Sequence, residues 1–160
     1  MIKQKRILAV VPARGGSKGI PLKNIYPLKG ESLIARVAKF IKDISIIDKA
    51  IVSTDHPKIA EEAIEHGLNS PFVRPKKISG DRVPDWDVLI HALEYMENID
   101  NVIYDIVLLL QPTSPMRKKD EVVGAINMLI EKNCDAVWTV SETDSKSHPL
   151  KQLNIYNKII

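Results

Sequence analysis

A Rossmann-like three-layer α/β sandwich with a mainly parallel sheet is predicted by three observations on the sequence. Short apolar runs alternate with helix-length amphipathic stretches along the chain, as in parallel α/β folds. The first run, residues 7–11 (ILAVV), is apolar at every position, which is expected of a strand buried on both faces. Polar segments of unusual composition follow residues 11, 53 and 110, and ligands in open parallel sheets bind beyond the carboxyl ends of the strands.

The next two predicted elements are a helix and a second strand. A glycine- and proline-bearing loop over residues 12–27 leads to residues 32–44, where apolar side chains recur at helical spacing. Residues 49–53 (KAIVS) are a short apolar run bounded by polar residues, which predicts a strand. These elements continue the alternation that a parallel sheet requires.

A second helix is predicted directly after the second strand. Asp55 is a candidate cap for it, and Pro57 is tolerated in its first turn. The helix is expected to run to His66 and to stop at Gly67, because glycine is common just past helix ends. Residues 71–74 then form a weak, short strand candidate.

The second half of the chain repeats the alternation. Residues 85–96 and 119–132 are predicted helices, because apolar side chains recur in both at helical spacing. The expected inward-facing residues are Trp86, Leu89, Ile90, Leu93 and Met96 in the first, and Val122, Val123, Ile126, Leu129 and Ile130 in the second. Residues 104–110 (YDIVLLL) are the strongest candidate for a central strand, residues 135–140 (DAVWTV) are the last clear strand, and residues 153–160 can form one more.

Length, charge and cysteine content exclude several classes of protein. The chain has 160 residues, which fits one domain, so residues 1–160 are predicted to form a single domain. Cys134 is the only cysteine, which excludes an internal disulfide and zinc sites built on two or more cysteines. The net charge of +3 comes with few aromatic residues and no basic stripe, so nucleic-acid binding is not expected. No apolar run is long enough for a membrane span or a signal peptide, and we expect a cytoplasmic protein.

The loop after the first strand has the composition of a phosphate-binding segment. Residues 12–24 (PARGGSKGIPLKN) contain three glycines, whose backbone can approach phosphate oxygens closely. Arg14, Lys18 and Lys23 would neutralise a triphosphate, and Ser17 can donate a hydrogen bond. The spacing matches neither the Walker A loop nor the G-x-G-x-x-G fingerprint. The alternative is a glycine-rich turn with solvated charges, which the position directly after a buried strand disfavours.

Residues 12–24 resemble the N-terminal signature of the CMP-acylneuraminate synthetases, also called acylneuraminate cytidylyltransferases. In that family the loop wraps the phosphates of CTP. The resemblance implies that Arg14, Lys18 and Lys23 act in catalysis, that Ala13, Ser17 and Asn24 contact substrate, and that the fold is of the nucleotide-diphospho-sugar transferase type. The Kdo cytidylyltransferases share the Pro-Ala-Arg opening and usually differ after it, so the resemblance favours the sialic acid branch.

Four further segments match the same family in the same order. Residues 53–55 (STD) resemble its STD element, with helix capping by Asp55 as the alternative. Arg74-Pro75 and residues 79–81 (SGD) resemble an element that borders cytosine and ribose, and a surface loop with incidental charge is the alternative. Residues 109–117 (LLQPTSPMR) are similar to LLQPTSPLR, and residues 148–151 (HPLK) to an HPLK element. The resemblance implies substrate contacts by Arg74, Ser79, Asp81, Gln111, Thr113, Ser114, Arg117 and Lys151.

The resemblance implies that CTP and a free acidic sugar are converted to a CMP-sugar and pyrophosphate. The anomeric hydroxyl would attack the α-phosphate while pyrophosphate leaves in line, a reaction that depends on positioning and charge neutralisation. Mg²⁺ is the expected counter-ion. The sequence assigns no general base and no ligands for the metal.

Members of the family continue past the length of this chain. The later part normally carries an NG-x-x-Y segment, a dimerisation arm and a D-x-D-type element that holds the metal, so residues 1–160 are expected to lack the C-terminal part of the enzyme and of the family homodimer. Asp85-Trp86-Asp87 has the D-x-D spacing, but it stands at a predicted helix start, where acidic residues favour the helix dipole.

Three hypotheses on function follow. The first is a cytidylyltransferase for N-acetylneuraminate or a similar nine-carbon acidic sugar. The second is an enzyme for a Kdo- or legionaminate-type sugar. The third is a catalytically silent nucleotide-binding or assembly module, for which CTP binding without turnover would be the sign.

Overall fold

The computed structural model describes Ile2 and residues 4–140 of the chain. The protein divides into two compact units, residues 1–119 and residues 120–160. The first unit contains the strands and the first three α-helices, and α4 (Lys119–Glu131) begins at the boundary. That the whole chain is a single domain stays a prediction.

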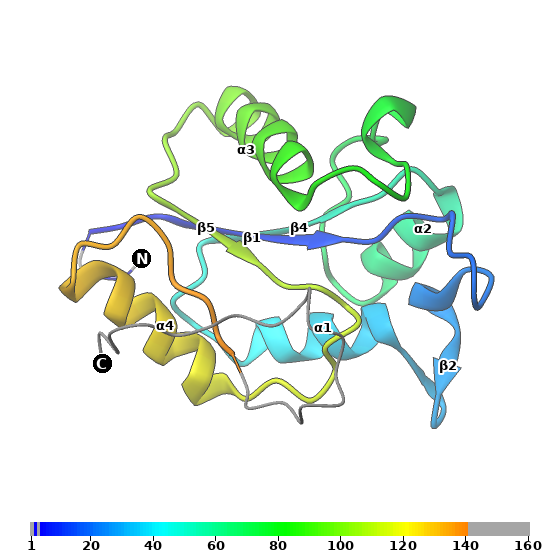
Figure 1. The fold of residues 1–160 in the computed structure, drawn as a ribbon, viewed down its shortest axis with the longest axis horizontal. Helices are drawn as coiled ribbons and strands as arrows, with labels where there is room; N and C mark the ends of the chain where they lie inside the picture. The colour runs from blue at the N-terminus through cyan, green and yellow to red at the C-terminus, as the bar shows by residue number, and fades with distance from the viewer. Residues whose placement is uncertain (1, 3, 141–160) are drawn as a thin grey trace. The chain divides into compact units, whose positions relative to one another are not determined.

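A parallel sheet forms the centre of the first unit. β1 (Ile7–Pro12) lies between β4 (Lys49–Ser53) and β5 (Ile106–Leu109), and all three run in the same direction (Figure 1). All five residues from 7 to 11 have an exposed fraction of 0%, because β1 has a strand on each side and helices over both faces. The predicted strands at residues 7–11 and 49–53 are confirmed.

The prediction that residues 104–110 form the central strand is wrong for the part of the chain that the structure describes. There β5 covers only Ile106–Leu109 and stands at the edge of the order β4-β1-β5. An apolar run reports burial of the two faces of a strand, but it carries no information on how many neighbouring strands it pairs with.

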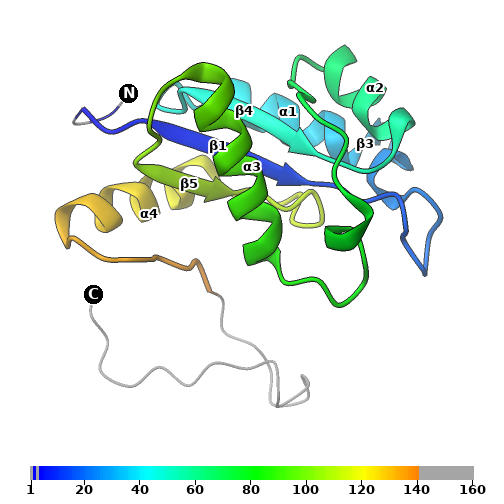
Figure 2. The ribbon, with the colours of Figure 1, turned by 90° about the horizontal axis from the view of Figure 1, so that it is seen from above.

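Helices cover both faces of the sheet, which confirms the three-layer α/β class. α1 (Leu33–Lys42) and α2 (Pro57–Glu65) pack on one face with Ala9 and Val11, which point to that side of β1. α3 (Asp85–Asp100) packs on the other face with Leu8 and Val10. Figure 1 shows α3 and α1 on opposite sides of the strands, and Figure 2 shows the strands side by side beneath α3.

The helix predicted at residues 32–44 is confirmed as α1, and its start follows from local chemistry. The Ser32 hydroxyl accepts a hydrogen bond from the backbone N–H of Ala35 at 3.0 Å, which caps the helix. A small antiparallel hairpin, β2 (Pro27–Leu28) and β3 (Glu31–Ser32), precedes it. Gly30 sits in the turn with φ of 83°, a conformation that glycine adopts without strain.

Asp55 does not cap α2, so that interpretation is wrong. The helix begins at Pro57 with His56 at the capping position and no side-chain capping bond. The Asp55 carboxylate instead accepts a hydrogen bond from the backbone N–H of Gly15 at 2.9 Å. The predicted end is confirmed, because Gly67 follows α2 with φ of 84°.

Three predictions on later elements are corrected. Residues 71–74 form no strand and make one isolated parallel bridge, from Val73 to Thr54. Trp86 is 68% exposed, because the buried side of α3 follows the four-residue spacing of Val88, Ala92 and Met96. Residues 135–140 form no strand, and Trp138 among them is 73% exposed. A strand needs a hydrogen-bonding partner, and hydropathy does not report whether one is present.

The remaining helix predictions hold. α3 extends four residues beyond the predicted end at residue 96, and two short 3₁₀ helices, η1 (Lys23–Ile25) and η2 (Lys76–Ile78), lie in loops. α4 matches the prediction, with Val122 and Ile126 buried. Residues 153–160 lie outside the described part of the chain. No helix among the described residues is long and apolar enough to cross a membrane.

Candidate nucleotide-binding site

A cavity of about 490 Å³ opens at the carboxyl ends of β1 and β5, within the usual range for small-molecule sites. From β1 the chain passes through α1 to β4 on one side, and it later reaches β5 on the other side through α3. The strand order therefore reverses beside β1, which is where open α/β sheets bind ligands. The lining residues are Pro12, Arg14, Ser17, Lys18, Gly19, Ile20, Lys23, Asn24, Arg74, Ile78, Gly80, Asp81, Val83, Asp85, Val88, Gln111, Pro112 and Thr113.

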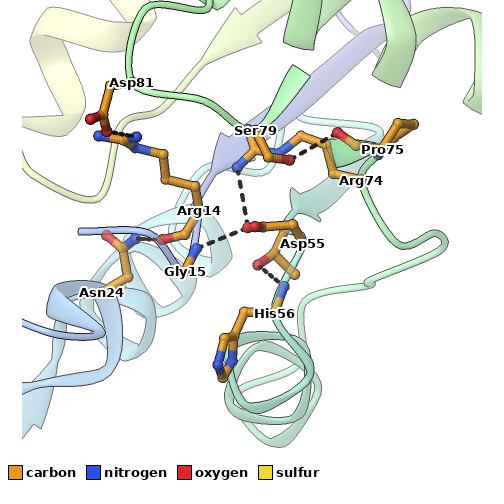
Figure 3. Close-up of polar contacts among 10 residues, drawn as sticks. Arg14, Gly15, Asn24, Asp55, His56, Arg74, Pro75, Ser79 and Asp81 are labelled. Atoms are coloured by element: carbon orange, nitrogen blue, oxygen red, sulfur yellow. Dashed lines mark hydrogen bonds and ion pairs between the residues drawn. The ribbon is translucent and has the colours of Figure 1, made fainter. Parts of the chain in front are cut away.

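The glycine loop after β1 is held by hydrogen bonds from both sides. The Gly15 N–H donates to an Asp55 carboxylate oxygen at 2.9 Å, and the buried Asn24 side chain donates to the Arg14 carbonyl at 3.2 Å (Figure 3). A Cβ atom on Gly15 would lie 2.8 Å from the Cβ and Cδ2 atoms of His56. Only glycine fits at this position, so the loop follows a defined path beside the end of β4.

Two cations of the loop share one carboxylate. Asp81 pairs with both Arg14 and Lys18, and all three residues line the cavity (Figure 3 shows the Arg14 contact). Hydrogen bonds from Lys18 and Arg14 hold the pKa of Asp81 below its ordinary value. Lys23 adds a third cation to the lining of the cavity. The three cations predicted from the sequence therefore all line this cavity, and the Asp81 carboxylate neutralises part of their charge.

Arg74 is the buried cation of the site. Its side chain is 3% exposed and lines the cavity, yet its Nε and Nη2 atoms have no hydrogen-bond partner among the described residues. The nearest carboxylate oxygen, on Asp55, is 3.9 Å from Nη2 (Figure 3). Burial lowers the pKa of Arg74, and the Asp55 charge opposes that shift. Buried polar groups in native proteins nearly always have partners, so these two nitrogen atoms are unusual in having none within the described chain.

The segment after β5 also lines the cavity. The Gln111 side-chain amide donates to an Asp85 carboxylate oxygen at 2.8 Å, which fixes its orientation. Thr113 also lines the cavity. Asp85 begins α3 and comes from the D-x-D sequence that was interpreted as a helix-dipole effect.

Among the described residues, Asp81 and Asp85 are the carboxylates that line the cavity. No group of three or more His, Cys, Asp or Glu side chains that could hold a metal occurs among the described residues. Mg²⁺ often takes one or two protein carboxylates together with substrate phosphates. The two aspartates therefore fit an ion shared with a bound phosphate, and they do not form a cage of their own.

A protein-family model described as "Cytidylyltransferase" matches residues 8–156. The chain belongs to this cytidylyltransferase family. It is 33% identical over 152 residues to the pseudaminic acid cytidylyltransferase of Campylobacter jejuni, and the match covers 95% of this chain and 65% of the relative. It is 39% identical over 123 residues to the CMP-N,N'-diacetyllegionaminic acid synthase of Legionella pneumophila, covering 77% of this chain and 53% of the relative.

The N-acylneuraminate cytidylyltransferase of Escherichia coli is 28% identical over 156 residues, covering 96% of this chain and 36% of that protein. The resemblance noted in the sequence is therefore confirmed. The chain spans 65% or less of the length of these three relatives. Among solved structures, a CMP:2-keto-3-deoxy-manno-octonic acid synthetase complexed with CTP has a TM-score of 0.65 at 22% identity, covering 81% of this chain and 49% of that one. It has the same fold as this cytidylyltransferase chain.

Four of the described site residues implied by the resemblance do not line the cavity of the cytidylyltransferase chain, and their roles stay predictions. Ala13 has an exposed fraction of 0% and belongs to the core. The Ser79 hydroxyl donates to the Pro75 carbonyl at 3.0 Å, and Ser114 is exposed beyond the cavity. Arg117 donates to the Gln111 carbonyl and stacks over Phe40, 5.6 Å from the ring centre. Lys151 lies outside the described residues.

Two acidic residues at or beside the site were not among the site residues named from the sequence, although Asp55 belongs to the STD segment that resembles the family. Asp55 and Asp85 both stand next to a predicted helix start, where an acidic residue already has an explanation as a cap or dipole partner. The signal that could have separated them is position, because Asp55 lies two residues after the end of β4 and its carboxylate accepts a hydrogen bond from Gly15 of the loop. Which acid turns toward the loop depends on tertiary contacts that spacing alone does not encode.

Proposed function

We propose that this chain carries the CTP-binding and catalytic core of an enzyme that transfers CMP from CTP to a nine-carbon acidic sugar, N-acetylneuraminate or a close relative, and releases pyrophosphate. One observation carries the proposal. The cavity at the carboxyl ends of β1 and β5 combines a cationic glycine loop with a buried, unpaired arginine, and a nucleoside triphosphate needs both kinds of contact.

The phosphates of CTP are assigned to the glycine loop. Arg14, Lys18 and Lys23 stand on one wall of the cavity, where they would neutralise the charge of the leaving pyrophosphate. Ser17 on the same wall has a hydroxyl that can donate to a phosphate oxygen. Phosphate binding would replace the contacts of Arg14 and Lys18 with Asp81.

The base is assigned to the deeper part of the cavity. Arg74 has unpaired N–H groups there that can donate to carbonyl and ring-nitrogen acceptors. Ile78, Val83 and Val88 supply apolar surface in the same wall. Gln111 and Thr113, on the β5 side, are left to contact the sugar.

The reaction forms a bond between the anomeric oxygen of the sugar and the α-phosphorus of CTP, and it breaks the bond from that phosphorus to the bridging oxygen. The anomeric hydroxyl loses its proton, and pyrophosphate leaves with the bridging oxygen. Arg14, Lys18 and Lys23 hold the departing charge, which is the main demand of phosphoryl-group chemistry. Mg²⁺, when bound beside Asp81 or Asp85, would supply further neutralisation of the phosphates.

The nine-carbon class of acidic sugar is supported by the names of the relatives. Pseudaminic acid, a legionaminic acid and N-acylneuraminate all occur in the names of proteins to which the chain is 28–39% identical. A 3-deoxy-manno-octulosonate cytidylyltransferase is 29% identical over 124 residues, covering 77% of this chain. The eight-carbon sugar is therefore the comparison substrate that a test must include.

Pyrophosphate release by this chain with CTP and Mg²⁺ tests the proposal. The sugar panel contains N-acetylneuraminate, a legionaminate, a pseudaminate and Kdo, and one reaction omits the sugar. Release is expected with a nine-carbon sugar and should be lost in Arg14→Ala and Lys18→Ala. It should remain in Lys58→Ala, which removes an exposed lysine of α2 away from the cavity. CTP binding without turnover would favour the silent module, and absence of CTP binding would overturn the site assignment.

A further inference from the structure

Asp55 lies behind the nucleotide cavity and contacts both of its halves. It follows β4 and does not line the cavity. One of its carboxylate oxygens accepts the hydrogen bond from Gly15 N–H at 2.9 Å, and the same oxygen is 3.9 Å from Nη2 of Arg74 (Figure 3). The glycine loop and the buried arginine come from distant parts of the sequence, so this carboxylate links them.

The contact with Gly15 fixes the glycine loop. On one side of Gly15 the carboxylate takes the N–H, and on another side the His56 ring leaves no room for a Cβ atom. His56 is itself held by a hydrogen bond from its N–H to the Thr54 hydroxyl at 3.2 Å. The Ala13 N–H donates to the Ser53 carbonyl at 2.9 Å. The four residues 53–56, at and after the end of β4, thus form the support against which the loop rests.

The contact with Arg74 has a different character. A separation of 3.9 Å is too long for a hydrogen bond, but it is short enough for charge attraction in a buried setting. The Arg74 backbone N–H donates to the Thr54 carbonyl at 2.7 Å, which places the arginine beside this segment. Asp55 therefore offsets the charge of Arg74 while it leaves the Nε and Nη2 donors free for a ligand.

We propose that Asp55 is a positioning residue that couples the phosphate half of the site to the base half: its hydrogen bond to Gly15 sets the shape of the loop, and its charge maintains the buried Arg74 in a ligand-ready state. The inference rests on the proposed function, because it assigns the two halves to the phosphates and the base of one nucleotide.

Two substitutions separate the roles of hydrogen bond and charge. Asp55→Asn keeps an oxygen that can accept from Gly15 but removes the charge, and Asp55→Ala removes both. Asp43→Asn is the control, since Asp43 is an exposed aspartate at the end of α1. Calorimetric titration with inorganic pyrophosphate reports on the loop, and titration with CMP reports on the base half. Thermal unfolding of each variant checks that it is folded.

Asp55→Asn is expected to bind pyrophosphate within about twofold of the wild type and CMP about tenfold more weakly, since hydrogen bonds and charge contacts of this kind contribute on that order. Asp55→Ala should weaken both ligands about tenfold. A residue with only a structural role would lower the melting temperature or weaken both ligands alike in the two variants. Equal losses of affinity for pyrophosphate and CMP in Asp55→Asn, or no loss in either variant, would overturn the proposal.

Amide hydrogen exchange of the ligand-free protein, followed by NMR, supplies a readout that needs no nucleotide. The Gly15 N–H should exchange slowly in the wild type and in Asp55→Asn, and fast in Asp55→Ala. Fast exchange in the wild type would contradict the role of Asp55 in the loop. If the wild type binds neither CTP nor pyrophosphate, the proposed function fails, and Gly15 exchange still decides whether Asp55 holds the loop.

Discussion

At the scale of single residues, Asp81 partly neutralises the positive charge of the ligand-free site. Its carboxylate takes up Arg14 and Lys18, the two cations assigned to the leaving phosphates. Lys18 is 82% exposed at its side chain, so the pairing is a surface contact that a more highly charged anion can displace. A phosphate group that binds to Arg14 and Lys18 must therefore compete with one of the protein's own side chains.

Asp81→Asn is expected to bind pyrophosphate about two- to fivefold more tightly, because exposed ion pairs contribute up to about 1 kcal/mol and their loss leaves Arg14 and Lys18 free for the ligand. Titration at low and high salt checks this, and the gain should shrink in high salt because exposed charges are screened. Asp43→Asn serves again as the charge-matched control. Weaker binding in Asp81→Asn would instead place Asp81 among the groups that bind the ligand.

Gly15 and Gly16 provide a matched pair in the same loop. A Cβ atom at Gly15 would lie 2.8 Å from His56, whereas a Cβ atom at Gly16 meets no atom of the described chain within 4 Å. Gly15→Ala is expected to destabilise the fold by about 1–3 kcal/mol, as overpacked positions do, and to weaken CTP binding. Gly16→Ala should change the unfolding free energy by less than about 1 kcal/mol. Urea unfolding measures both.

A second variant shows whether the clash itself causes the loss. His56→Ala removes the ring against which the new Cβ would press. The double variant Gly15→Ala, His56→Ala should recover part of the lost stability relative to the sum of the single changes. Strict additivity of the two changes would argue that the effect of Gly15→Ala lies in the unfolded chain.

Some residues of the site could be predicted from a short segment of sequence, and others could not. Arg14, Lys18 and Lys23 were predicted because a glycine-rich, basic loop after a buried strand is visible within thirteen residues of sequence. The burial of Arg74 and the turn of Asp55 toward Gly15 were not predicted, because both result from the approach of segments far apart in the chain. Local composition identifies a charged loop, whereas the contacts that its residues make with distant segments are determined by the folded chain.

At the scale of elements, the end of α3 is joined to two strand segments by Asp100. Its carboxylate accepts from the Tyr104 hydroxyl at 2.6 Å, just before β5, and from Lys49 at the start of β4 at 3.3 Å. The hydrogen bond from Tyr104, with that from Lys49, holds the pKa of Asp100 below its ordinary value of 3.8. Burial and the same hydrogen bond raise the pKa of Tyr104.

Asp100→Asn is expected to lower the unfolding free energy by about 1 kcal/mol at neutral pH, the usual contribution of such a hydrogen bond. A carboxyl with a depressed pKa in the folded state stabilises the fold above its unfolded pKa, and that stability is lost as pH falls through the folded value. The difference between wild type and Asp100→Asn should therefore shrink below pH 3.8. Urea unfolding at neutral and acid pH measures it, and a difference that grows in acid would contradict this assignment.

The helices and strands were predicted correctly where the pattern of apolar residues within the segment itself determines the structure. β4 was predicted at its observed bounds, and α1 was predicted from its apolar spacing. The failures concern relations between segments. Trp86 was placed inward because it is apolar, although the buried side of α3 passes through Val88, Ala92 and Met96. Residues 135–140 have the composition of a strand, but composition cannot supply the partner that a strand requires.

At the scale of the whole molecule, ligand binding should appear as added stability. CTP at a hundred times its Kd is expected to stabilise the folded state by about 2.7 kcal/mol, because it binds the folded chain and not the unfolded one. For a chain of this size that corresponds to a rise in Tm of roughly 5–10 °C. Differential scanning calorimetry with CTP, CMP, ATP and pyrophosphate checks it. A rise with ATP equal to that with CTP would contradict selection of cytosine.

The central place of β1 determines how the chain can be assembled during its synthesis. β1 leaves the ribosome before β4 and β5, the two strands with which it pairs, and its second partner follows about 100 residues later. At roughly 5–20 residues per second, an almost wholly apolar strand then waits on the order of 5–20 s with an open edge. The segment that becomes the best-protected part of the fold is thus the most aggregation-prone part of the nascent chain. We expect chaperone binding to the emerging polypeptide to centre on residues 7–12.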